Sequence, residues 1–66
     1  MSVLKVLEIT CSSDKSWEDA AKKGIEKTSK TVKGIKSAWV KDQSVKVKDG
    51  KAAEYRVTLK VSFEVD

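Results

Sequence analysis

Apolar and polar residues alternate without interruption through residues 54–65. One side of this segment is apolar, and the other side carries the only arginine of the chain, Arg56. An alternation of period two over this length predicts a long β-strand with one buried face. The second face must therefore contact either water or another subunit.

Two further strands are expected. Residues 3–10 carry apolar side chains on both sides, a pattern that favours a strand buried on both faces. A second strand is predicted over Ile35–Lys48. Asp49 and Gly50 follow it and form the signal for a two-residue type I′ turn, so the second and third strands should form a hairpin.

A helix is predicted between the first two strands, with Ser16 as its N-cap and Asp19 at the third helical position. Its apolar positions recur at spacings of three and four and end near Gly34. They are Trp17, Ala20, Ala21, Gly24, Ile25, Thr28 and Val32. We expect Trp17 to be buried beneath the helix. Gly24 costs about 1 kcal/mol relative to alanine in a helix, and close packing on the sheet would explain it.

The order β-α-β-β predicts an α+β fold in which one helix packs on one face of a three-stranded antiparallel sheet. Residues 1–66 should form a single domain. Chains of this size usually add a disulfide, a metal or oligomerisation to a thin core. Cys11 is the only cysteine and histidine is absent, so oligomerisation is the expected reinforcement.

The hairpin turn predicts a register in which paired residue numbers sum to 99, as 49 and 50 do. On the helix side the expected pairs are Ala38–Val61 and Val40–Leu59. On the face away from the helix, called the open face below, they are Ser37–Ser62, Trp39–Lys60, Lys41–Thr58 and Gln43–Arg56. Strict alternation also places Val45 and Val47 on the open face, whereas a β-bulge near Gln43 or Ser44 would move them to the core.

The charge of +4 comes from 14 basic and 10 acidic residues and raises the question of nucleic-acid binding. Acids precede lysines by four residues in the helical segment, which is typical of ion pairs on a solvated helix face. No basic stripe interleaved with aromatic residues is seen, so we expect no nucleic-acid partner. The sequence contains neither an apolar run of about 20 residues nor a basic-then-apolar leader, which predicts no membrane partner and a cytoplasmic protein.

Nothing in the sequence indicates catalysis, because histidine is absent and no nucleophile has an evident base. Cys11 near the helix start could have a lowered pKa, although inert packing is favoured. Asp14, Asp19 and Glu54 are more typical of surface charges than of calcium ligands, since no loop with alternating oxygen ligands is present. No metal site is therefore predicted.

Trp39 and Arg56 are the candidate functional residues of the open face, and each has two interpretations. Trp39 could cover a subunit interface, where tryptophan is enriched, or provide a stacking platform for a planar ligand. Arg56 could be a cross-strand partner of an acid, or it could present its planar fork to a carbonyl-rich ring or a phosphate.

The sequence resembles the dodecins, a family of small flavin-binding proteins, over nearly its whole length. The resemblance is carried by the β-α-β-β order and by four segments. These are Thr10-Cys11-Ser12-Ser13, Ser16-Trp17-Glu18-Asp19-Ala20-Ala21, Trp39-Val40-Lys41-Asp42-Gln43, and residues 54–65.

This resemblance implies a hollow homododecamer built from trimers, with the helices outside and the open faces of the sheets inside. It implies that flavins (riboflavin, FMN or FAD) stack in pairs between tryptophans where trimers meet, and that the protein stores or buffers them. Some members also hold coenzyme A, and a subgroup suits calcium better. The alternative expectation is thus a similar shell that binds flavin poorly and holds coenzyme A or calcium.

The resemblance also implies the candidate ligand-binding residues Ser37, Trp39, Asp42, Gln43 and Arg56. In the flavin binders the stacking tryptophan aligns with Ser37, and Trp39 lies two residues further on the same strand face. The family's glutamine, which binds the ring edge, aligns with Arg56. Arginine can donate to flavin carbonyls or favour a phosphate, as in FMN, but it cannot accept from the ring N–H.

Overall fold

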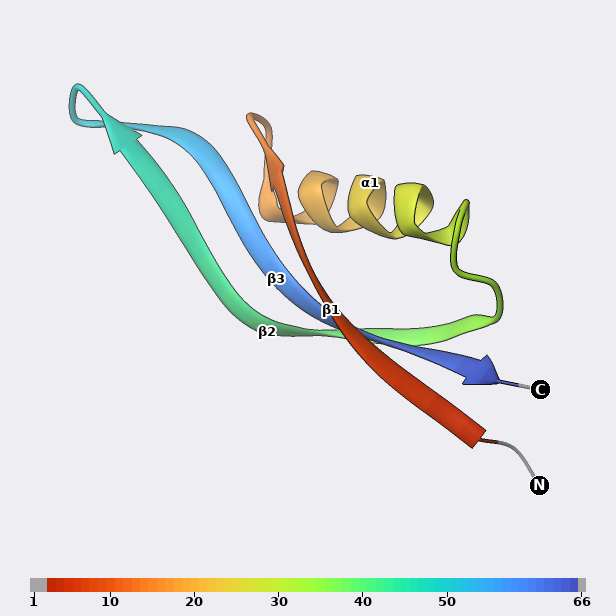
Figure 1. Cartoon of the computed structure of the whole chain (residues 1–66). Helices are drawn as coiled ribbons and strands as arrows, with labels where there is room; N and C mark the ends of the chain where they lie inside the picture. Colours follow the sequence, from red (N-terminus) through yellow and green to blue (C-terminus); the bar gives the residue numbers. More distant parts are fainter. Residues whose placement is uncertain (1–2, 66) are drawn as a thin grey trace.

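The computed structural model describes residues 3–65 and confirms the predicted fold. Its elements are β1 (Val3–Ser13), α1 (Trp17–Ser29), β2 (Ile35–Lys48) and β3 (Lys51–Val65). The strands form one antiparallel sheet in the order β1-β3-β2, so the last strand is central. Figure 1 shows α1 lying across one face of the sheet, while the end of the β2–β3 hairpin extends beyond the helix. This end of the hairpin, residues 44–55, is called the arm below.

The bounds of β2 and the hairpin turn agree with the sequence prediction. Asp49 and Gly50 have φ angles of 52° and 74°, the paired positive values that a type I′ turn requires. β1 extends to Ser13 rather than ending at residue 10. The expectation that β1 is buried on both faces is wrong for the single chain, because β1 is an edge strand and its first apolar residues are exposed. These residues are Val3, Leu4 and Val6.

The start of α1 is capped as predicted. The Ser16 hydroxyl accepts a hydrogen bond from the backbone N–H of Asp19 at 2.9 Å. The Asp19 carboxylate accepts a hydrogen bond from the Ser13 hydroxyl at 2.6 Å and pairs with Lys23 at 3.2 Å. This hydrogen bond from Ser13, together with Lys23, holds the pKa of Asp19 below its ordinary value. The cap thus also ties the helix start to the end of β1.

The end of α1 differs from the prediction. The helix stops at Ser29, with Lys30 as C-cap, rather than near Gly34. Val32 therefore lies outside the helix. Gly34 has a φ of 75°, and its carbonyl accepts a hydrogen bond from the backbone of Glu64 at 2.9 Å, so the glycine shapes the connection into β2.

The core lies between α1 and the middle of the sheet. Its buried hydrophobic residues are Ala20, Val57, Leu59 and Val61. Gly24 faces β1 so closely that a Cβ atom there would overlap the sulfur of Cys11, which confirms the expected close packing. Burial raises the pKa of the Cys11 thiol, the reverse of the lowering that a nearby helix start can give.

Trp17 is not part of this core, contrary to expectation, and its side chain remains 37% exposed. It is the first residue of α1 and lies beside the hairpin arm. Its indole N–H donates to the carbonyl of Ser44 at 2.9 Å, and its ring meets Tyr55 edge-on at 5.2 Å. The Ser44 carbonyl thus satisfies the indole N–H at this partly exposed position. Trp17 therefore fastens the helix start to the arm.

A β-bulge between Val40 and Asp42 shifts the register of the hairpin by one residue, and a second irregularity between Lys46 and Val47 restores the predicted register next to the turn. The pairs before the bulge are as predicted and include Trp39–Lys60. Beyond the bulge the predicted Lys41–Thr58 and Gln43–Arg56 pairs are wrong. The observed pairs there are Asp42–Thr58, Gln43–Val57, Ser44–Arg56, Val45–Tyr55 and Lys46–Glu54. The bulge thus occurs slightly earlier than the positions considered from the sequence.

The shifted register moves Val45 from the open face to the helix side, where it lies opposite Tyr55. It does not become a core residue. Val45 is 38% exposed and Val47 63% exposed, because α1 packs on β1 and β3 and does not reach this part of β2. The arm therefore has exposed apolar side chains on its helix side.

Candidate functional site

The open face is built from alternate residues of the three strands, and Trp39 contributes to it from the edge strand β2. Trp39 is opposite Lys60 on β3, and Lys60 is opposite Glu8 on β1, so the three form one row across the sheet. Tyr55 shares a side of β3 with the buried Val57, so it faces the helix side. Trp39 is 47% exposed. It is thus an accessible aromatic surface on a mostly polar sheet face.

The bulge places two consecutive β2 residues, Lys41 and Asp42, on the open face. The ammonium of Lys41 reaches across β3 to the Glu8 carboxylate at 3.1 Å. Asp42 lies opposite Thr58, whose hydroxyl is 3.3 Å from that of Thr10. The indole of Trp39 is therefore surrounded by a mixed set of cations, carboxylates and hydroxyls rather than by further apolar side chains.

Arg56 lies toward the arm on the same face. Its guanidinium Nη2 pairs with the Glu54 carboxylate at 3.1 Å, and its side chain is 51% exposed. The acid is thus a neighbour along the same strand and not the cross-strand partner that the sequence suggested. Arg56 borders a hollow of about 350 Å³ whose lining residues are Ser44, Val45, Lys46 and Arg56.

Four of the five predicted ligand-binding residues share the open face. Ser37 lies opposite Ser62, and their hydroxyl oxygens are 2.6 Å apart. Gln43 is the exception, because it is opposite the buried Val57 and therefore belongs to the helix side. Sequence reasoning missed Ser44 and Lys46 as neighbours of Arg56, since only the bulge brings them to this face.

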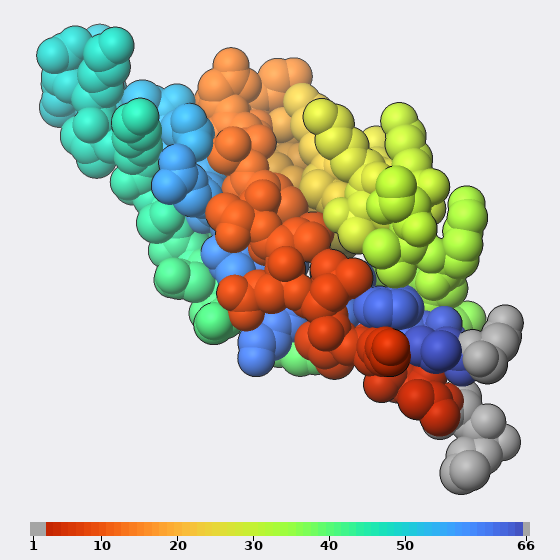
Figure 2. All heavy atoms as spheres, viewed as in Figure 1, coloured from red at the N-terminus to blue at the C-terminus, as the bar shows by residue number. Residues whose placement is uncertain are grey.

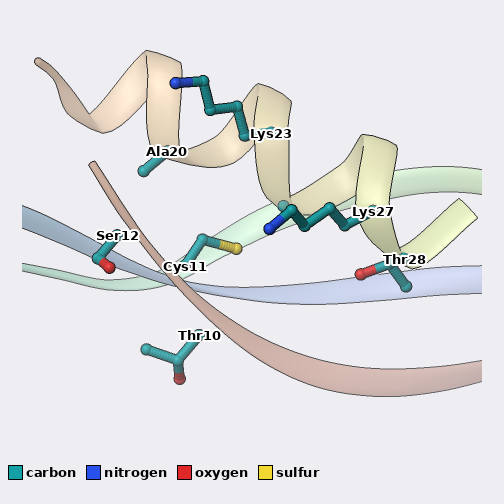
Figure 3. A pocket seen from close by; sticks show the side chains of 8 residues that line it. Thr10, Cys11, Ser12, Ala20, Lys23, Lys27 and Thr28 are labelled. Carbon is teal, nitrogen blue, oxygen red and sulfur yellow. The ribbon is translucent and has the colours of Figure 1, made fainter. Parts of the chain in front are cut away.

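A second hollow, also of about 350 Å³, lies on the helix side between β1 and α1. Figure 3 shows the sulfur of Cys11 directed toward the helix and the side chains of Lys23 and Lys27 on the helical wall. In the space-filling view β1 runs in front of the sheet beside α1, and the arm projects clear of the helix (Figure 2). None of the predicted ligand-binding residues lines this second hollow.

Residues 3–65 contain neither a metal-binding cluster within one protomer nor a helix able to cross a membrane. No group of three or more His, Cys, Asp or Glu side chains in this range is placed to hold a metal ion in one protomer. The one helix in the described range, α1, is too short and too polar to cross a membrane.

Comparison with known proteins identifies a family. A family model described as Dodecin matches residues 3–66. A relative from Mycobacterium tuberculosis, named calcium dodecin, is 37% identical over 65 residues, which cover 98% of this chain and 92% of the relative.

Solved structures agree over the same extent. The chain is similar to a dodecin from Streptomyces davaonensis, with a TM-score of 0.94 at 28% identity, over 98% of this chain and 96% of the other. It is also similar to the calcium dodecin of M. tuberculosis, described as a calcium-chelating antigen with a calcium-binding site. That match has a TM-score of 0.85 at 35% identity, over 98% of this chain and 93% of the other.

Proposed function

The chain belongs to the dodecin family, and from this premise we propose that it is a non-catalytic protein whose homo-oligomer binds a flavin on the open face. The observation that carries the proposal is the accessible indole of Trp39 on a sheet face that no element of the described chain covers. An indole plane stacks favourably on an aromatic ring system such as isoalloxazine.

Oligomerisation supplies the second wall of the binding site. The buried hydrophobic core contains only four residues, while Leu4, Val6 and Trp39 remain about half exposed on the open face. A core this small in a chain of this length favours further burial of such residues by oligomerisation. We propose that copies of the chain cover these side chains, in a dodecamer of trimers as the family resemblance implies. An isolated protomer would then hold no flavin.

The residues of the open face have distinct proposed roles. Trp39 forms the aromatic wall, and Ser37 and Asp42 line the pocket with a hydroxyl and a carboxylate. Arg56 donates from its guanidinium to a flavin oxygen, because it carries several N–H donors and no acceptor. Gln43 lies on the helix side and is given no role in this pocket.

Flavin fluorescence tests the proposal directly. Titration of riboflavin and FMN with the purified protein should quench their emission stoichiometrically, because flavin emission is lost when the ring stacks on an electron-rich indole. The particle mass should be measured in the same buffer by native mass spectrometry. Emission that stays unchanged at micromolar concentrations of an intact oligomer would remove the flavin proposal.

Calcium is the second candidate ligand, because the relative with 37% identity is named calcium dodecin. No calcium-type cluster forms within residues 3–65 of one protomer, so a site would need carboxylates from several copies. The open face offers Glu8, Asp42 and Glu64 for this purpose.

Thermal unfolding with calcium, with magnesium and after EGTA distinguishes the two ligands. If calcium is bound between copies, it should raise the unfolding temperature, EGTA should reverse the rise, and magnesium should have little effect. No calcium-dependent rise, together with flavin quenching, would leave flavin as the ligand.

A further inference from the structure

The net positive charge of the chain is concentrated in residues 27–36, called the basic segment below. The segment runs from the last turn of α1 through the connection to the start of β2. It carries no acidic residue and four lysines, which are Lys27, Lys30, Lys33 and Lys36. The other ten of the 14 basic residues are matched in number by the ten acidic residues, so the formal charge of +4 equals the charge of this segment.

The four lysines of the basic segment are exposed, and within residues 3–65 none of them forms an ion pair. The lysines one turn earlier in α1 do form ion pairs. Lys22 pairs with Glu18 at 3.3 Å. Lys23 pairs with Asp19 at 3.2 Å. The neutralisation of α1 by its own acids thus stops before the basic segment begins.

Stabilisation of the helix end accounts for only two of the four lysines. A cation near the C-terminus of a helix interacts favourably with the helix dipole, and Lys27 and Lys30 lie there. Lys33 and Lys36 lie beyond the helix, and the dipole effect is confined to its last turn. Like charges gathered in so short a segment repel one another, and a bound anion would relieve this repulsion. The segment therefore fits an anionic partner.

The basic segment is accessible at one end of the molecule. Figure 2 shows it in yellow-green on a projecting corner, at the opposite end of β2 from the hairpin turn. Lys27 also borders the hollow between β1 and α1 (Figure 3). Glu64 of β3 lies beside the segment, because its backbone N–H donates to the Gly34 carbonyl, but within residues 3–65 its carboxylate forms no ion pair. The positive charge is thus presented to solvent.

The composition of the basic segment indicates which anion it fits. Residues 27–36 include no aromatic residue and no exposed large apolar side chain. A surface without apolar anchors is poorly suited to a bilayer, and one without aromatic rings is poorly suited to stacking on unpaired bases. The phosphates of a duplex require only cations. The lack of aromatic residues, from which we expected no nucleic-acid partner, therefore argues against contact with bases and not against contact with phosphates.

We propose that the basic segment binds the phosphate backbone of double-stranded nucleic acid without reading its sequence. Lysine ammonium groups are compact charges that contact phosphate oxygens through charge-assisted hydrogen bonds, and each contact releases counterions from the duplex. This binding goes beyond the proposed flavin function and does not depend on it. Copies of the chain that cover the open face would leave α1 facing outward, so several basic segments could engage one duplex.

Fluorescence anisotropy of a labelled DNA duplex, titrated with the purified protein over a series of salt concentrations, tests the proposal. The logarithm of the association constant should fall with the logarithm of the salt concentration. Its slope should be about −3 to −4 for each engaged segment, since each phosphate contact contributes about −0.9. A second duplex of different sequence should bind equally well. No binding at low salt, or a clear preference for one sequence, would contradict the proposal.

The double variant Lys33→Gln/Lys36→Gln removes two charges from the segment without altering the helix end. It should lower duplex affinity about tenfold or more and make the salt slope shallower by about 2. Lys48→Gln/Lys51→Gln is the matched control, because it removes the same charge from exposed positions beside the hairpin turn and should change binding little. Equal weakening by both variants would assign binding to overall charge and overturn the proposal.

Acetylation of lysines in the wild-type protein gives a measurement that requires no variant. Bound duplex should protect the four lysines of the basic segment from acetic anhydride, whereas Lys48 and Lys51 should react at the same rate with and without duplex. Mass spectrometry of the digested protein measures the modification at each lysine. Equal protection of Lys48 and Lys51 would show that the duplex does not select the basic segment.

Vesicles that contain phosphatidylserine distinguish a nucleic acid from a membrane surface. Because the basic segment has no apolar anchor, the protein should bind the duplex more tightly than these vesicles at the same salt concentration. Binding to the vesicles without binding to the duplex would assign the segment to lipid head groups and overturn the proposal.

Discussion

Replacing Trp39 with alanine should abolish stoichiometric quenching of flavin emission. Trp39 provides the accessible aromatic surface of the open face, whereas Tyr55 faces the helix side and Trp17 lies at the helix start. Loss of a stacked aromatic wall removes both buried area and ring–ring attraction, together roughly 3 kcal/mol, or about a hundredfold in dissociation constant. Fluorescence titration measures this change.

Trp17→Phe is the matched control, because it removes the other indole from the opposite side of the molecule. Trp17 bonds to the carbonyl of Ser44 and contacts Tyr55, so its loss should lower stability slightly and leave flavin binding unchanged. The particle mass of both variants must match that of wild type. Full quenching by an assembled Trp39→Ala oligomer would show that this indole is not the platform.

Gly24→Ala should destabilise the protein, although the same exchange usually stabilises a helix. Alanine gains about 1 kcal/mol of helix propensity. Its methyl group would overlap the Cys11 sulfur, and forced overpacking typically costs about 1–3 kcal/mol or more in a close helix–sheet contact. We expect a net loss of up to about 2 kcal/mol in the free energy of unfolding. Urea unfolding at one fixed protein concentration measures it.

The double variant Cys11→Ala/Gly24→Ala isolates the contact. Removal of the sulfur makes room for the new methyl group, so Gly24→Ala should cost less in the Cys11→Ala background than in wild type. A coupling free energy above about 0.5 kcal/mol would identify direct contact. Additive effects, or stabilisation by Gly24→Ala alone, would show that this glycine does not set the distance between α1 and β1.

Local signals in the sequence predicted most of the fold. The hydroxyl of Ser16 caps the helix start, and the Asp49-Gly50 pair adopts the positive φ angles that its residue types favour. Both features depend on a few neighbouring residues and little on the rest of the chain. The alternation in residues 54–65 likewise predicted the face of the central strand that becomes buried.

Features that depend on distant parts of the molecule were not predictable. The register shifts at Val40/Asp42 and at Lys46/Val47 have no glycine or other local signature, yet together they decide which side chains lie beside Arg56. Trp17 has the spacing of the apolar helix positions that face the sheet. This spacing predicts which side of the helix Trp17 lies on, but not whether the sheet covers it, and Trp17 remains partly exposed beside Tyr55. The apolar residues on both sides of β1 predicted that both of its faces are buried. In one protomer α1 packs on only one of these faces, and Leu4 and Val6 on the other face remain exposed.

The short reach of α1 leaves the outer strand of the sheet unprotected in the single chain. The outer strand β2 presents Val40, Val45 and Val47 to solvent beside a free backbone edge. An uncovered edge of this kind invites pairing with any available strand. The copies that we propose to cover the sheet would also shield this edge, so the isolated protomer should be the form most prone to non-native strand pairing.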